Sequence, residues 1–132
     1  MKRFLIAALA LSLFAALAAP AAAAKPALSG TISINEPGPY ALDSALTFTT
    51  TVSGMSGSEW AMVYVQCVDA NGNVLYGQLD YPTATFILGG GWSPWRDQPS
   101  TDAICHADLY VFNKQHVSTT VASTPAFAAA GA

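Results

Sequence analysis

Apolar and polar residues alternate along most of this chain, and the alternation predicts β-strands. Leu28, Ile32 and Ile34 are separated by serine and threonine. Residues 46–52 repeat the pattern, with threonines between the apolar positions. A period of two residues puts alternate side chains on opposite faces of a strand, so each stretch is expected to have one face in the core and one in solvent.

Five further strands are predicted, and turn residues separate them. The Asn71-Gly72 pair favours the tight turn of a hairpin, because both central residues of that turn take positive φ. The strand before this pair should therefore fold back on the strand after it. No segment from Lys25 onward shows the 3.6-residue period of an amphipathic helix. The five strands are expected at residues 60–68, 74–80, 83–88, 103–112 and 116–122.

Seven short strands without a helix indicate two antiparallel sheets packed face to face. The order of strands and loops over residues 27–123 resembles the immunoglobulin-like superfamily. This resemblance implies an all-β fold, an immunoglobulin-like sandwich of about seven strands, for residues 25–123. In that superfamily the inter-sheet cysteines lie on the second and sixth strands, whereas Cys67 lies on the third predicted strand here. A likeness at the level of the fold carries no function with it.

The chain has two cysteines, Cys67 and Cys105. They lie on the third and sixth predicted strands, which are neighbours in one sheet of the proposed sandwich. Each cysteine shares a strand face with apolar residues, so both thiols are expected to point into the core and to form one disulfide. In the chain-entropy model, closing a loop of about 38 residues stabilises a fold by about 4 kcal/mol.

Both ends of the chain carry a compositional signal. At the start, two basic residues precede an apolar run of roughly 16 residues, and small residues follow up to Ala24. This order predicts a signal peptide at residues 1–24 and a secreted or periplasmic protein, with no membrane insertion after cleavage. A membrane anchor is the alternative, but the run falls short of the ~20 residues that a spanning helix needs. The alanine-rich residues 124–132 are expected to form a disordered tail.

The charge of the expected mature chain excludes some partners. From Lys25 onward, three basic residues stand against eight acidic ones, a net charge of 3 − 8 = −5. An acidic domain with isolated cations lacks the positive patch that binds nucleic acid or anionic lipid. We therefore expect neither partner, and no motif in the chain indicates a cofactor.

The sequence does not predict a pair of acid–base residues close enough together for catalysis. His106 and His116 are about 20 Å apart if their strands form a hairpin, too far to act on one substrate. Cys105 and His106 are adjacent on a strand and point to opposite faces, so they form no dyad. A small secreted hydrolase would require His106 to meet one of three carboxylates: Asp80, Asp97 or Asp102.

One acidic segment has the spacing of a calcium-binding loop. Asp69, Asn71, Asn73 and Asp80 occupy positions one, three, five and twelve of that register. Position six is Val74, where such a loop needs glycine. A hairpin turn explains the same residues by backbone geometry, and we expect no metal site.

Residues 92–96 have the sequence Trp92-Ser93-Pro94-Trp95-Arg96. This segment resembles the tryptophan motif of thrombospondin-type repeats, in which tryptophan and arginine side chains stack in layers. The two tryptophans either cover an open end of the core or stand out as an aromatic platform for sugar or peptide. Arg96 could stack on either ring by cation–π attraction.

The predicted strands leave a row of side chains outside the core of the cysteine-bearing sheet. Tyrosines, amides and a charge dominate this row, which is the composition of protein-recognition surfaces. The leading hypothesis is a non-enzymatic binding module that recognises protein or carbohydrate through this face, with the Trp92 loop at its rim. The alternative is a structural or assembly component that pairs through an edge strand. The side chains expected to face outward are Met62, Tyr64, Gln66, Tyr76, Gln78, His106, Asp108, Tyr110 and Phe112.

Overall fold

The computed structural model describes residues 25–132. Within that range the chain forms ten β-strands and one short 3-10 helix, and it contains no α-helix. The mostly β fold predicted from the sequence pattern is confirmed. The signal peptide expected at residues 1–24 lies outside the described residues. In the described part of the chain, no helix has the length and apolar character needed to span a membrane.

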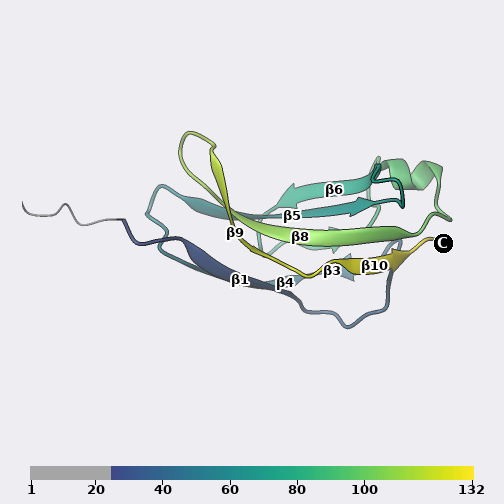
Figure 1. The fold of residues 1–132 in the computed structure, drawn as a ribbon, viewed down its shortest axis with the longest axis horizontal. Coiled ribbons are helices and arrows are strands. Elements are labelled where there is room, and N and C mark those ends of the chain that lie inside the picture. Colours follow the sequence, from purple (N-terminus) through teal and green to yellow (C-terminus); the bar gives the residue numbers. More distant parts are fainter. Residues whose placement is uncertain (1–24) are drawn as a thin grey trace, which may run out of the picture.

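Six strands form the largest sheet, in the order β2–β10–β8–β5–β6, with β9 also paired to β8 (Figure 1). Strands β9 and β10 follow one another along the same side of β8, and both run antiparallel to it. Strand β2 closes one edge by pairing in parallel with β10. The six strands are β2 (Tyr40–Ala41), β5 (Trp60–Val68), β6 (Val74–Asp80), β8 (Ala103–Phe112), β9 (Ser118–Ser123) and β10 (Phe127–Ala130).

Four strands make two smaller antiparallel pairs, β1 with β4 and β3 with β7. Figure 1 shows β1 and β4 lying across from β5 and β8. The apolar residues of both groups of strands belong to one buried cluster, so the core lies between them. The four strands are β1 (Ser29–Ile34), β3 (Ala45–Leu46), β4 (Phe48–Ser53) and β7 (Phe86–Ile87).

Strands β5, β6 and β8 begin and end at the residues predicted from the sequence. The stretch 46–52 departs from its prediction, because the ladder is interrupted at Thr47. The backbone N–H of Thr47 donates to a Glu36 carboxylate oxygen at 2.8 Å, and its carbonyl accepts from the Asn35 N–H at 3.0 Å. The one predicted strand therefore becomes β3 and β4, each in a different pair.

The last predicted hairpin has a longer turn than expected. The backbone N–H of Asn113 donates to the Val117 carbonyl, and His116 adopts a φ of 61°. Ser118, rather than His116, therefore lies opposite Phe112.

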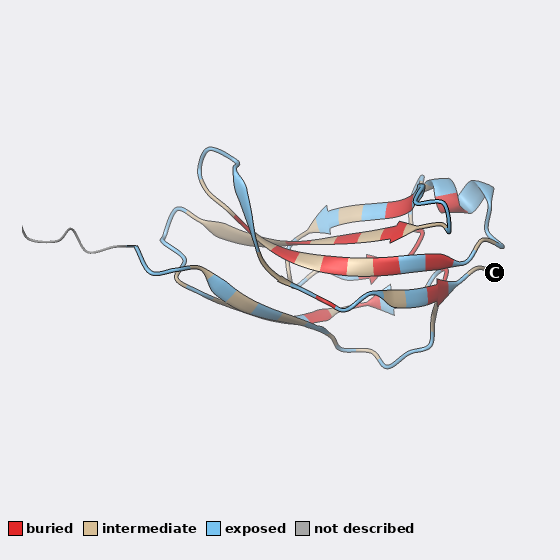
Figure 2. Ribbon diagram, in the orientation of Figure 1, coloured by how far each residue is buried: buried red, intermediate tan, exposed pale blue. Residues whose placement is uncertain are grey.

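The predicted disulfide between Cys67 and Cys105 is present. The two residues are direct partners in the β5–β8 ladder, with their Cα atoms 4.0 Å apart, and both side chains are fully buried. Buried and partly exposed residues alternate along β8, as Figure 2 shows, so the cysteines lie on the core side of the sheet. This arrangement confirms that the third and sixth predicted strands are neighbours in one sheet.

A bulge changes the orientation of β6. The β5–β6 register shifts at Cys67/Val68, so that Leu75 and Tyr76 are both buried. A one-residue shift moves every later side chain of a strand to the other face. Tyr76 and Gln78, predicted to face outward, instead share the core side with Cys67 and Val65, and that prediction is wrong.

The C-terminal residues are part of the sheet, where the sequence predicted a disordered tail. Strand β10 lies between β8 and β2, and Ala129 is 1% exposed. The buried Thr124 links this segment to the sheet, since the Ala107 N–H donates to its Oγ1 at 3.0 Å and its own N–H donates to the Ala107 carbonyl at 2.9 Å. Alanine has little preference for strands, so pairing on both sides of β10 determines its structure.

The segment with the calcium-like spacing forms a hairpin turn. The Asp69 carboxylate accepts from the backbone N–H groups of Asn71 and Asn73 at 2.8 and 2.9 Å. These bonds hold its pKa below the usual range. Among residues 25–132 there is no group of three or more histidine, cysteine, aspartate or glutamate side chains that could hold a metal ion.

Candidate functional site

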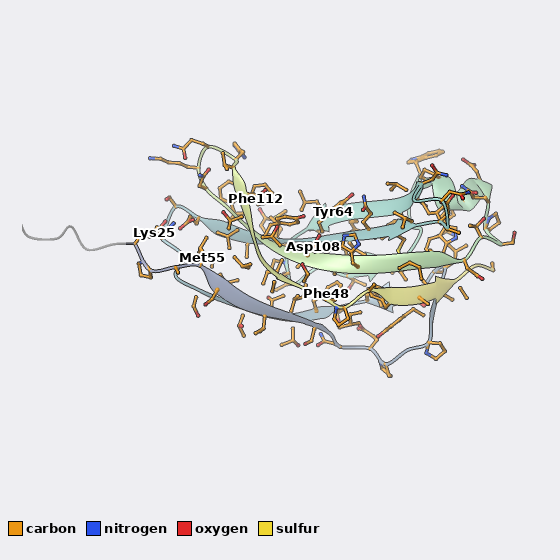
Figure 3. All side chains as sticks on the ribbon, viewed as in Figure 1. Lys25, Phe48, Met55, Tyr64, Asp108 and Phe112 are labelled. Carbon is orange, nitrogen blue, oxygen red and sulfur yellow. A yellow bond between two sulfur atoms is a disulfide. The ribbon has the colours of Figure 1, made fainter. Side chains whose placement is uncertain are left out.

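Seven neighbouring side chains on the two central strands of the large sheet point away from the core, and we call the surface that they form the outer face. Each is partly exposed, whereas the residues between them on the same strands are buried or core-facing. Figure 3 shows Tyr64, Asp108 and Phe112 on this part of the molecule. The outer face consists of Met62, Tyr64 and Gln66 on β5 and His106, Asp108, Tyr110 and Phe112 on β8.

Asp108 is the centre of a hydrogen-bond network on the outer face. Its Oδ1 accepts from Ser123 Oγ at 2.6 Å, and its Oδ2 accepts from the Tyr110 hydroxyl at 3.2 Å. The Nε2 atom of His106 lies 3.3 Å from the same Oδ2. The side chain of Asp108 is only 15% exposed, so the network fixes a carboxylate at a surface that is largely shielded from water.

Tyr64 lies beside this network on the neighbouring strand, and its hydroxyl is held by Gln66. Asp108 is its direct partner in the β5–β8 ladder, and Gln66 Nε2 donates to its hydroxyl at 3.2 Å. A Cβ atom on Gly77 would lie 2.8 Å from the same hydroxyl. The absence of a side chain at Gly77 therefore allows the Tyr64 ring to lie over β6.

Aromatic residues surround two hollows at the end of the outer face. Trp60 stacks on Phe112 with ring centroids 5.8 Å apart, and His116 meets the Trp60 ring edge-on at 5.5 Å. The hollows have volumes of about 250 and 210 Å³, and both are lined by Phe112 and Leu79. Tyr64 and Tyr110 line the first hollow, and Trp60 lines the second.

The phenol of Tyr110 is held in its neutral form. Burial raises its pKa above the ordinary value, and the neighbouring Asp108 carboxylate adds to this effect. A side-chain hydrogen bond with Thr120 acts in the opposite direction and lowers the pKa of Tyr110, but burial dominates, so the neutral hydroxyl remains a donor to Asp108.

The network does not have the arrangement of a nucleophilic enzyme. Ser123 and His106 both contact Asp108. A catalytic serine needs the histidine itself as its hydrogen-bond partner. The hydrolase hypothesis required His106 to meet Asp80, Asp97 or Asp102, but the carboxylate beside it is Asp108.

Tyr76 and Gln78 form a separate polar row with Asp80 on the core side of β6. The Tyr76 hydroxyl donates to Gln78 Oε1 at 2.5 Å, and Gln78 Nε2 donates to Asp80 Oδ2 at 3.3 Å. Burial raises the pKa of Tyr76 to about 12, and the Asp80 charge contributes to the shift. These two predicted site residues are therefore separated from the outer face by the sheet itself.

The two tryptophans of the 92–96 segment have opposite environments. Trp95 lies in the 3-10 helix η1 (Pro94–Asp97), is fully buried, and donates from Nε1 to the Thr101 carbonyl at 2.8 Å. Trp92 is fully exposed. Trp95 therefore covers the core, as one of the two alternatives expected, whereas Trp92 stands out from the surface and its use as a platform for sugar or peptide stays a prediction.

Arg96 fixes the loop that carries Trp92. Its guanidinium forms a bidentate pair with the Asp43 carboxylate, and its Nε donates to the Gly89 carbonyl. This pair lowers the pKa of Asp43 below its usual range. Arg96 therefore pairs with a carboxylate where cation–π stacking was considered from the sequence.

Several residues of the site were not found from the sequence, among them Trp60, Gly77, Leu79 and Ser123. Trp60 and Ser123 could have been placed by their cross-strand partners, Phe112 and Asp108, once the register was known. Gly77 and Leu79 reach the outer side only because of the β6 bulge, for which the sequence gives no signal.

No family model, curated protein or solved structure matches this chain.

Proposed function

We propose that this chain is a secreted, non-enzymatic, immunoglobulin-like binding module that recognises protein or carbohydrate through the outer face. The architectural part of this proposal is supported by the pairing of the cysteine-bearing strands and by the parallel contact of β2 with β10. Export is supported by the buried disulfide, because such bonds persist in oxidising compartments.

One observation carries the binding function: a row of partly exposed tyrosines, an amide and a carboxylate that are already ordered by one another. Tyr64, Gln66, Asp108 and Tyr110 all take part in side-chain hydrogen bonds. A surface ordered before binding loses little side-chain entropy when a ligand arrives. Tyrosine offers a large contact area and a hydroxyl for little entropy, and it is enriched at recognition surfaces.

The test is binding of the purified protein to cell-surface protein and glycan panels. A double variant, Tyr64→Ala with Tyr110→Ala, removes two rings of the outer face and is expected to lose at least tenfold in affinity, since buried aromatic anchors dominate interfaces. The matched control is Thr49→Ala with Thr51→Ala, two exposed positions on β4, in the other layer. Equal binding by wild type and the tyrosine variant would contradict the proposal. Binding to members of only one panel, glycan or protein, would identify the class of partner.

A further inference from the structure

A second concave surface lies at the opposite end of the large sheet, where β2, β10 and the start of β8 meet near the C-terminus (Figure 1). It has a volume of about 440 Å³, which is within the range of ligand sites. We call it the alanine groove. It is lined by Pro39, Tyr40, Ala70, Asp102, Ala103, Ile104, Ala128, Ala129 and Ala130.

The groove exists because small side chains form most of it. Ala128 and Ile104 are direct partners in the β10–β8 ladder, and Ile104 is 51% exposed. Tyr40 is held in place by edge-on packing against Phe127, at 5.1 Å between ring centroids, and by its hydroxyl bond to the Glu36 carbonyl at 2.8 Å. An apolar surface with fixed walls is thereby left open to solvent.

Asp102 is the charged residue of this lining. Its Oδ1 accepts from the Gly131 N–H at 2.9 Å, which orients the carboxylate at the groove. No basic side chain lines the groove, and two of the three cations between residues 25 and 132 are engaged elsewhere: Lys25 with Glu59, and Arg96 with Asp43. The surface is therefore complementary to an apolar group that carries a positive charge.

We propose that the alanine groove binds an extended peptide segment of a partner protein, in which a bulky apolar side chain adjoins a lysine or arginine. The apolar side chain lies against Ile104, Ala128 and Tyr40, and the cation pairs with Asp102. A lysine side chain alone is too small to fill the groove, so the neighbouring apolar side chain provides most of the contact. The site does not use Tyr64 or Tyr110, and it is independent of the proposed function of the outer face.

The experiment measures binding of the capped tetrapeptide glycine-phenylalanine-lysine-glycine to the protein by backbone amide NMR titration. The amides of Ile104, Ala128 and Ala130 are expected to shift. Ala128→Leu fills an exposed part of the groove and is expected to weaken binding at least tenfold. Asp102→Asn keeps the acceptor for Gly131 but removes the charge, and a loss of about two- to fivefold is expected, the range for exposed ion pairs.

Control variants distinguish a loss of binding at the groove from nonspecific effects of added bulk or lost charge. Ala45→Leu adds the same bulk at an exposed position outside the groove, and Asp97→Asn removes an exposed charge on η1; both should bind like wild type. The Tyr64→Ala, Tyr110→Ala variant should also bind normally, so failure of one proposed site does not affect the other. The proposal is overturned if Ala128→Leu binds the tetrapeptide as tightly as wild type does. It is also overturned if wild type binds a peptide with glutamine in place of the lysine equally tightly. Equally tight binding of hexylammonium would assign the groove to free amines and would likewise overturn it.

Discussion

Loss of the Cys67–Cys105 bond is expected to remove a large share of the stability of this fold. The bond links residues 38 positions apart. In the chain-entropy model a loop of this length contributes about 4 kcal/mol by restricting the unfolded chain. Domains of this kind unfold with only about 5–15 kcal/mol, so the reduced protein should remain folded but be much less stable.

The measurement compares the thermal unfolding of three forms: the oxidised protein, the protein unfolded and refolded in reductant, and the double variant Cys67→Ala with Cys105→Ala. A loss of 1 kcal/mol lowers Tm by about 4–8 °C in a domain of nearly this size, so reduction should lower Tm by roughly 15 °C or more. The alanine variant should melt lower still, because both cysteines are fully buried and their replacement leaves a void.

Reduction requires prior unfolding in this experiment, because neither sulfur is accessible in the native protein. Free-thiol titration confirms that the refolded sample is reduced. If the reduced protein melts within about 5 °C of the oxidised one, the assignment of stability to loop closure is refuted. A normal Tm for the reduced form with a low Tm for the alanine variant would show that packing, rather than the cross-link, provides the stabilisation.

Three further outcomes are expected. Gly30→Ala should destabilise the protein by about 1–3 kcal/mol in chemical denaturation, since the new Cβ would lie 2.5 Å from a backbone oxygen, whereas Gly57→Ala, with open space around it, should not. Hydrogen bonds from Lys25 and Ser56 hold the pKa of Glu59 at about 2. The Tm advantage of wild type over Glu59→Gln should therefore be full above pH 4.5 and disappear as the pH falls towards 2, and a Tm difference that stays constant with pH would refute this. Spectroscopic titration should show one tyrosine ionising near pH 12, and Tyr76→Phe should abolish that step; its persistence would assign it to another tyrosine.

The sequence pattern was sufficient where each face of a strand has a distinct composition. Strands β5 and β8 alternate between buried apolar residues and larger polar or aromatic ones, and their bounds and the disulfide between them follow from that alternation. The orientation of β6 was not predictable in this way. Val74, Leu75 and Tyr76 are all apolar or aromatic, so either register satisfies the pattern, and the bulge decides which residues face the core.

Long-range pairing determined what the local sequence could not show. The Phe127–Ala130 segment has a composition typical of a tail, and it is a strand because β8 and β2 lie on either side of it. Trp92 and Trp95 are three residues apart and chemically identical. Their different burial follows from the local backbone: Gly91, just before Trp92, adopts a φ of 64°, and Pro94, just before Trp95, begins the 3-10 helix.

The polar row on β6 bears on how copies of this protein behave at high concentration. Strand β6 ends the large sheet, and an unpaired seven-residue edge is a template on which fibrils can grow. A strand added there would have to place its own inward side chains beside Gln78 and Asp80. Inward-pointing charged side chains on an edge strand are one way in which sheets avoid pairing with further chains, so we expect this row to disfavour the addition of an apolar strand to β6.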